Sequence, residues 1–143
     1  MKSKKLSIII PVYNGENYIK SICKQLNNQT YKDFELIIVD DCSTDTSVET
    51  VKEYQKEDKR IHLIENKRKR YNGGSRNVGI EYALENINFD YFAMLDSDDW
   101  WKDENVLQKR DSLSVFGYED LGFWKGRTLE CESIIDDLEE LLK

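Results

Sequence analysis

The chain has 143 residues, of which 39% are hydrophobic and 34% are charged, and its formal net charge is −7. This length favours one domain with a sizeable core, and the acidic balance argues against a general nucleic-acid binder. No apolar run approaches the roughly 20 residues of a membrane span, the start shows no signal-peptide pattern, and three cysteines without metal-ligand spacing indicate a reduced, cytoplasmic chain.

Four apolar runs predict β-strands, at residues 6–12, 34–39, 61–65 and 91–95. The runs are rich in β-branched or aromatic side chains, and a near-continuous run of this kind is typical of a strand buried on both faces. Segments with helical spacing separate the four runs. A strand-helix alternation predicts a parallel sheet with right-handed crossovers, so the expected fold class is α/β.

Three helices are predicted between these strands. Asn14 is the expected N-cap of the first helix, Thr46 and Glu49 have capping-box spacing before the second, and the third is expected to start near Ser75. The apolar stripes of the three helices are Tyr18, Ile19, Ile22, Cys23 and Leu26, then Val48, Val51 and Tyr54, and then Ile80, Ala83, Leu84 and Ile87.

Polar segments follow all four predicted strands, at residues 11–16, 40–41, 73–77 and 96–99. Ligands of open parallel sheets bind beyond the carboxyl ends of the strands, at a topological switch point. We therefore expect these four segments to open on one edge of the sheet. Pro11 cannot donate a ladder hydrogen bond and is expected where the first strand leaves the sheet.

The segment after the fourth strand carries three carboxylates, on Asp96, Asp98 and Asp99. Like charges clustered at the end of a buried strand cost free energy unless a cation neutralises them. Oxygen ligands suit Mg²⁺ or Mn²⁺, which typically also takes substrate phosphate oxygens. The alternative is a solvated acidic turn.

Four segments of the chain resemble the nucleotide-binding half of family 2 glycosyltransferases, which are inverting enzymes with the GT-A fold. The segments are residues 7–14, 34–45, 74–77 and 95–100. They occur in the family's order and spacing and cover about the first 110 residues. The resemblance implies one domain over residues 1–143, with a Rossmann-like nucleotide-sugar-binding part at 1–110 and helices on both faces of its sheet.

The resemblance also implies how the base of a UDP-sugar would be held. Backbone groups of Pro11, Val12 and Tyr13 and the carboxylate of Asp41 would hold the uracil. A carboxylate can accept the ring N–H, and a tyrosine can stack on the base. Glu16 is a further candidate, although stabilisation of the first helical turn accounts for it equally well.

Further residues are implied for the sugar-diphosphate part of the ligand. Gly74 would let the backbone pass close to it, and Arg76 would meet the ribose or the diphosphate. A surface salt bridge is the alternative for Arg76. The basic run at residues 67–70 could attract diphosphate or an anionic membrane, which leaves peripheral membrane association open, but short charge runs are usually a solvated face.

Asp96, Ser97 and Asp98 match the family's D-x-D motif, with Asp98 as the first choice for a metal ligand. Asp96 would share the ion, and Asp99 would either share it or touch the ribose. The implied cofactor is Mn²⁺ or Mg²⁺.

The last part of the chain departs from the family, whose members carry a longer second half with an acceptor site and a catalytic base. Residues 118–124 resemble the family's Glu-Asp base segment, in which Asp120 would deprotonate the acceptor hydroxyl and Glu119 would assist. An acidic loop is the alternative. Residues 111–143 are therefore expected to be a shortened remainder that ends in an amphipathic helix, with Ile134, Ile135, Leu138, Leu141 and Leu142 on its apolar stripe.

The function implied is metal-dependent transfer of a sugar, with inversion, from a UDP-sugar to an acceptor that the sequence does not identify: a glycan, a lipid-linked molecule or a protein. An alternative is a truncated UDP-sugar-binding domain with little or no transferase activity. A nucleotidyltransferase is a third interpretation, but it needs an early glycine-rich phosphate loop, and residues 11–15 offer none.

Overall fold

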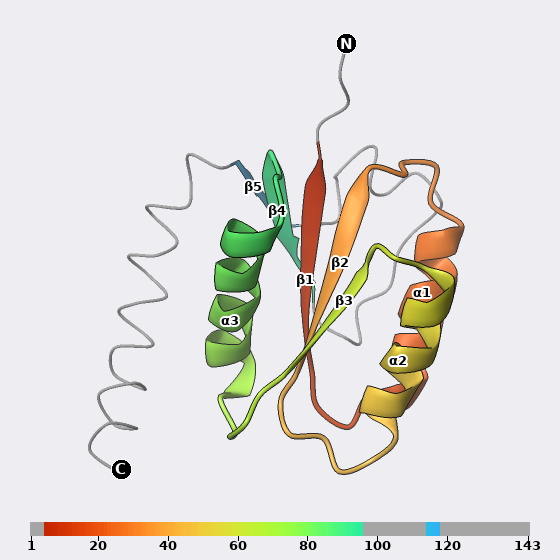
Figure 1. Ribbon diagram of the computed structural model, residues 1–143, viewed down its shortest axis with the longest axis vertical. Coiled ribbons are helices and arrows are strands. Elements are labelled where there is room, and N and C mark those ends of the chain that lie inside the picture. Colours follow the sequence, from red (N-terminus) through yellow and green to blue (C-terminus); the bar gives the residue numbers. More distant parts are fainter. Residues whose placement is uncertain (1–4, 96–113, 118–143) are drawn as a thin grey trace, which may run out of the picture.

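The computed structural model describes residues 5–95 and the backbone of residues 114–117 (Figure 1). Within these residues, no helix is long and apolar enough to cross a membrane. The elements are β1 (Leu6–Val12), α1 (Glu16–Asn27), β2 (Phe34–Asp40), α2 (Ser47–Glu57), β3 (Ile61–Glu65), α3 (Tyr71–Asn86), β4 (Tyr91–Met94) and β5 (Ser114–Gly117). The four predicted strands are thus confirmed to within one residue at each end.

The strands form one sheet in the order β3-β2-β1-β4-β5. The first four strands are parallel, with Leu6 of β1 opposite Phe34 of β2 and Tyr91 of β4. The fifth strand, which the sequence did not predict, pairs antiparallel with β4. Strands β2 and β3 lie on one side of β1 and β4 lies on the other, so the topological switch point is between β1 and β4.

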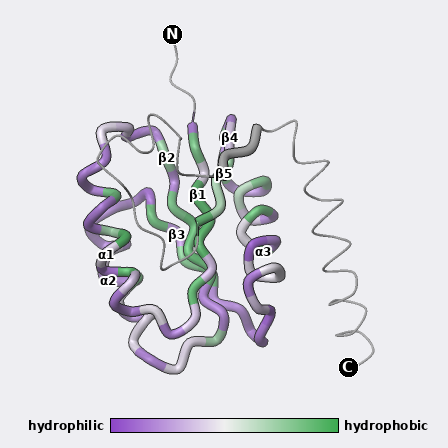
Figure 2. The backbone as a smooth tube through the Cα atoms, turned by 180° about the vertical axis from the view of Figure 1, so that it is seen from behind, coloured by the Kyte–Doolittle hydropathy of each residue, from purple (hydrophilic) through white to green (hydrophobic). Residues whose placement is uncertain are grey.

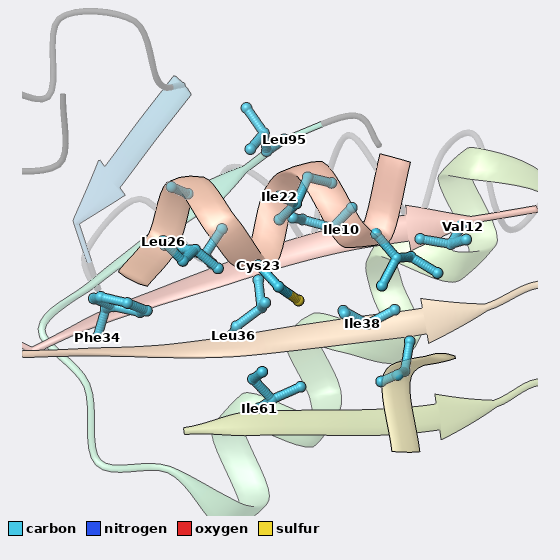
Figure 3. Close-up of a cluster of buried hydrophobic side chains, with 14 of the residues drawn as sticks. Ile10, Val12, Ile22, Cys23, Leu26, Phe34, Leu36, Ile38, Ile61 and Leu95 are labelled. Carbon is cyan, nitrogen blue, oxygen red and sulfur yellow. The ribbon is translucent and has the colours of Figure 1, made fainter. Parts of the chain in front are cut away.

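Helices cover both faces of the sheet, as predicted (Figure 1). Successive residues of a strand point to opposite faces. In β1, Ile8 and Ile10 join the cluster under α1 and α2, while Ile9 joins the cluster under α3. Figure 3 shows the first cluster, in which Cys23 of α1 lies next to Leu36 of β2. The central strands are therefore apolar on both sides, and in Figure 2 hydrophobic colour is concentrated on them.

Helix α3 packs very close to the sheet at Gly79. A β-carbon on this residue would lie 2.5 Å from Ile9 Cγ2 and 3.3 Å from Val39 Cγ2. On the same helix, Ile80 and Ala83 are buried, as the predicted apolar stripe requires. The missing side chain of Gly79 is what allows the helix backbone to approach β1 and β2.

Three local predictions were wrong. Gly15, and not Asn14, occupies the N-cap position of α1. Thr46 is the N-cap of α2 but makes no side-chain capping bond, because its hydroxyl donates to Glu16 instead. Tyr18 was expected on the apolar stripe of α1, yet 49% of its surface is exposed.

The start of α3 was also mispredicted. The helix begins at Tyr71 and not near Ser75, so the segment 73–77 is helical and is not a loop. The reason is a contact from Asp41, the residue directly after β2.

Candidate active site

Three of the four predicted polar segments meet at the carboxyl edge of the sheet. The connections after β1, β2 and β3 all lie at the lower end of the molecule in Figure 1, and hydrophilic colour marks this end in Figure 2. The fourth segment begins at Asp96, outside the described residues. The residue before it, Leu95, donates its N–H to Ile9 O at 3.1 Å.

The first two connections are bound to each other through Asn14. The N–H of Thr44 donates to Asn14 Oδ1 at 2.7 Å, and the N–H of Asn14 donates to Ser43 Oγ at 2.9 Å. The N–H of Gly15 also donates to Ser47 Oγ, at 3.0 Å. These side-chain bonds replace the helix cap that was expected of Asn14, and they hold the turn that carries Tyr13 in place.

Asp41, in the connection after β2, is hydrogen-bonded to the end of the connection after β3. Its side chain is 95% buried, and its Oδ1 accepts the N–H of Arg70 at 2.7 Å, while its Oδ2 accepts the N–H of Tyr71 at 2.8 Å. Both N–H groups belong to the start of α3, where helical donors lack partners. The carboxylate of Asp41, the residue directly after β2, therefore caps α3, which is why the helix starts four residues earlier than predicted.

Asn66, the first residue after β3, links these groups further. Its N–H donates to Asp40 O at 2.9 Å, and its Nδ2 donates to Asp41 Oδ1 at 3.1 Å and to Ser75 Oγ at 3.0 Å. The sequence reasoning missed Asn66. The one sequence feature that points to Asn66 is its position directly after a predicted strand. Asp41 occupies the same kind of position after β2.

Two exposed tyrosines and one lysine gather beside Asp41. Tyr13 and Tyr71 are 52% and 66% exposed. The ammonium of Lys69 lies 3.0 Å from the ring centroid of Tyr13, 5.6 Å from that of Tyr71, and 3.6 Å from Asp41 Oδ2. The edge thus combines aromatic surface, a buried carboxylate and a cation within a few ångströms.

Backbone strain is concentrated at the same edge. Among the described residues, only three non-glycine residues have positive φ: Asn14 at 48°, Cys42 at 64° and Tyr71 at 62°. Asn14 and Cys42 lie in the connections after β1 and β2, and Tyr71 is the first residue of α3. Such conformations cost about 1–3 kcal/mol each and cluster at functional sites, where the surrounding structure enforces them.

The remaining predicted residues in the described part lie near this edge. Pro11 pairs with Val39 of β2, and it lies past the last described β1–β4 pair, Ile9 with Met94. Residues two apart in a strand direct their backbone groups to the same neighbouring strand. The carbonyl of Ile9 faces β4, so an N–H at position 11 would face β4 as well. The missing N–H of Pro11 therefore removes no hydrogen bond to β2. The expectation that Pro11 lies where the strand leaves the sheet is met on the β4 side only.

Gly74 is buried in the first turns of α3, and Arg76 is half-buried two residues later. Glu16 is the first residue of α1 and accepts the hydroxyl of Thr46, so it already has a structural partner. Their predicted ligand contacts stay predictions.

The residues predicted to carry metal and base chemistry lie outside the described residues. In the part of the chain that the structure describes, no group of three or more His, Cys, Asp or Glu side chains could hold a metal ion. The predictions that fall outside are Asp96, Ser97, Asp98, Asp99, Glu119 and Asp120.

A cavity of about 330 Å³ lies at the opposite end of the strands, lined by Phe34 and Ile61, the first residues of β2 and β3. Cys23 also lines it, and burial, with the nearby charge of Asp58, raises the pKa of this thiol to about 12. None of the predicted site residues lines this cavity. The predicted site residues that the structure describes lie at the carboxyl edge, at the other end of the strands.

Comparison with known proteins identifies the family of the chain. A family model described as glycosyl transferase family 2 matches residues 7–110. The chain is 40% identical over 105 residues to the glycosyltransferase GlyA of Streptococcus pneumoniae, covering 71% of this chain and 14% of that protein. It is 38% identical over 120 residues to the putative teichuronic acid biosynthesis glycosyltransferase TuaG of Bacillus subtilis, covering 79% of this chain and 46% of that protein.

Solved structures show the same relationship. The crystal structure of S. aureus TarS 1–349 superposes with a TM-score of 0.64 at 29% identity, covering 74% of this chain and 31% of that one. The same TarS fragment has been solved in complex with UDP-GlcNAc. The chain spans less than half the length of these relatives. With the family model matched over most of its length, the chain belongs to glycosyl transferase family 2.

Proposed function

We propose that the carboxyl edge binds the nucleotide of a UDP-sugar, and that the chain takes part in transferring the sugar to an acceptor. The observation that carries this proposal is the meeting of Tyr13 and Asp41, from two different connections, around one small volume. The likeness to TarS, a protein solved with UDP-GlcNAc, supports the choice of nucleotide.

The base would lie between Tyr13 and Asp41. The exposed ring of Tyr13 offers a stacking surface. Asp41 Oδ2 accepts one hydrogen bond, from the N–H of Tyr71, and a carboxylate oxygen can accept a second. Uracil carries a ring N–H that would supply it. Pro11 and Val12 would contribute backbone groups beside the switch point.

The diphosphate would lie toward the start of α3, where the helix dipole favours anions. Gly74 and Arg76 lie in the first turns of this helix. The guanidinium of Arg76 can bind phosphate oxygens with two parallel donors. Glu16, at the start of α1, would lie at the far side of the same edge.

A divalent cation, Mn²⁺ or Mg²⁺, would be held by Asp98 and Asp96, with Asp99 and Ser97 beside them. The donor set fits such an ion, because it consists of carboxylate oxygens. Bound there, the ion would neutralise charge on the diphosphate leaving group. The segment follows Leu95, whose hydrogen bond to Ile9 lies next to the carboxyl edge.

Transfer would need a base for the acceptor hydroxyl. We assign this role to Asp120, assisted by Glu119. Removing the proton as the hydroxyl attacks in line with the departing diphosphate inverts the anomeric centre. The acceptor is a glycan, a lipid-linked molecule or a protein, and a cytoplasmic location is consistent with a UDP-sugar donor.

The test is calorimetric titration of the full chain with UDP and with ADP, with and without Mn²⁺, beside product formation on candidate acceptors. We expect UDP to bind more tightly than ADP, and Mn²⁺ to strengthen UDP binding. Asp98→Asn should abolish the Mn²⁺ effect, whereas the control Asp90→Asn should keep it, because Asp90 accepts the N–H of Lys5 at the amino edge of the sheet. An Mn²⁺ effect that survives in Asp98→Asn would refute the metal assignment.

Asp120→Asn separates binding from chemistry. It should abolish sugar transfer and leave UDP affinity unchanged, because a general base contacts the acceptor and not the nucleotide. Retained transfer would dismiss Asp120 as the base. UDP binding without product formation in the unmodified chain would leave nucleotide-sugar binding as its activity.

A further inference from the structure

Lys69 lies where the proposed base would have to lie. Its ammonium is 3.0 Å from the centroid of the Tyr13 ring and 3.6 Å from Asp41 Oδ2. The ammonium therefore covers the face of Tyr13 that looks toward the carboxylate. It makes a cation–π interaction with Tyr13 and an ion pair with Asp41, whose side chain is 95% buried, and the ring of Tyr71 lies farther away, at 5.6 Å.

This position excludes a stacked base. Carbon atoms in contact are separated by about 3.5–4.0 Å, so a base on the ring of Tyr13 fills the layer at that height. The ammonium of Lys69 occupies this layer at the ring centre. A base that also donates to Asp41 Oδ2 must sit on the same side of the ring, so base and ammonium cannot both be bound.

We propose that Lys69 is an internal competitor for the nucleobase, which must displace its ammonium from Tyr13 and Asp41 before it binds. The inference rests on the proposed function, because it takes Tyr13 and Asp41 as the base site. It adds a specificity role for a residue of the basic run, for which the sequence favoured a solvated face over attraction of a diphosphate or an anionic membrane.

The surrounding contacts allow this displacement. Asp41 keeps its hydrogen bonds from the N–H groups of Arg70 and Tyr71 and from Asn66 Nδ2 when the ammonium leaves. The carboxylate therefore stays in position for the base. Lys69 carries a flexible four-carbon stem, and its side chain is already 34% exposed, so the ammonium can move to solvent.

Displacing the ammonium affects the binding free energy of different ligands differently. A nucleoside binds more weakly by the free energy of the two broken contacts, because it offers the ammonium no new partner. A nucleoside diphosphate brings anionic oxygens that attract the released cation. Lys69 therefore selects for ligands that carry the diphosphate, beyond any direct contact with the base.

The test measures the dissociation constants of uridine and of UDP, without divalent metal, for the unmodified chain and for Lys69→Met. Removing the competitor should tighten uridine binding about three- to tenfold, the range that a cation–π contact of this kind supports. UDP binding should gain less than uridine binding, so the preference for UDP over uridine should fall.

Lys67→Met is the matched control, since it removes the same charge from an exposed position of the same connection. It should leave uridine affinity unchanged. Lys69→Gln repeats the test with a polar side chain, and thermal unfolding confirms that each variant is folded. Uridine affinity that is unchanged or weaker in both Lys69 variants would overturn the inference while leaving the proposed function in place. An unmodified chain that binds neither uridine nor UDP, with or without Mn²⁺, would overturn both.

Discussion

Gly79 offers a quantitative test of how α3 lies on the sheet. In Gly79→Ala, the added methyl would lie 2.5 Å from Ile9 Cγ2, which is about 1 Å inside normal carbon contact. Ile9 and Val39 are fully buried in the two central strands, so neither can move aside easily. The helix or the sheet must therefore shift.

The expected free-energy change combines two opposing effects. Overpacking of a core costs about 1–3 kcal/mol, and the close contact with Ile9 places this case at the upper end. Alanine is favoured over glycine inside a helix by about 1 kcal/mol. The net destabilisation should be about 2 kcal/mol, which lowers the Tm by roughly 4–8 °C for a chain of this size.

Gly73→Ala is the control on the same helix. A β-carbon on Gly73 would meet no atom within 4 Å, and no described glycine has positive φ. This variant should be as stable as the unmodified chain or more stable, by up to about 1 kcal/mol. Urea unfolding followed by circular dichroism measures both variants. If Gly79→Ala is as stable as Gly73→Ala, α3 does not contact β1 as described.

Two further predictions concern the free energy of unfolding away from the carboxyl edge. Side-chain hydrogen bonds from Arg60 hold the pKa of Asp58 below its ordinary value of 3.8, so the charged carboxylate stabilises the fold at neutral pH. Asp58→Asn should therefore lower the free energy of unfolding by about 1 kcal/mol at pH 7. Urea unfolding should show that the difference between the two chains shrinks as the pH falls below 3.8, because Asp58 then becomes protonated in the folded chain as well. The hydroxyl of Tyr82 lies 3.0 Å from His62 Nδ1 and joins α3 to β3, so Tyr82→Phe should lower the unfolding free energy by about 0.5–1.5 kcal/mol, whereas Tyr18→Phe, at an exposed position, should not. Equal stability of the two Tyr→Phe variants would contradict the link to His62.

The strands of this fold could be predicted because their burial is nearly complete. Ile8, Ile9 and Ile10 are all fully buried, two on one face and one on the other. A strand that is covered on both faces needs apolar residues at consecutive positions, and that pattern is visible in a single sequence. The meeting of the connections at one edge then follows from parallel pairing.

The start of α3 could not be predicted in the same way. Residues 71–74 read Tyr-Asn-Gly-Gly, a composition with low helix propensity. The helix nevertheless begins there because Asp41, about 30 residues earlier in the chain, accepts the first N–H groups. Propensity is a local quantity, and this cap is a contact between distant segments. Strand β5 is a similar case, since four residues pair with β4 across a long connection.

The internal contacts of the edge also decide what a ligand can reach there. Asp41 Oδ1 is already bonded to Asn66 and Arg70, so Oδ2 is the atom that can accept a further donor. Beside that atom, the ammonium of Lys69 covers the ring of Tyr13. The capping of α3 sets the path of the connection that carries Lys69. The capping of α3 by Asp41, which the sequence did not predict, therefore also positions Lys69 at the proposed base site.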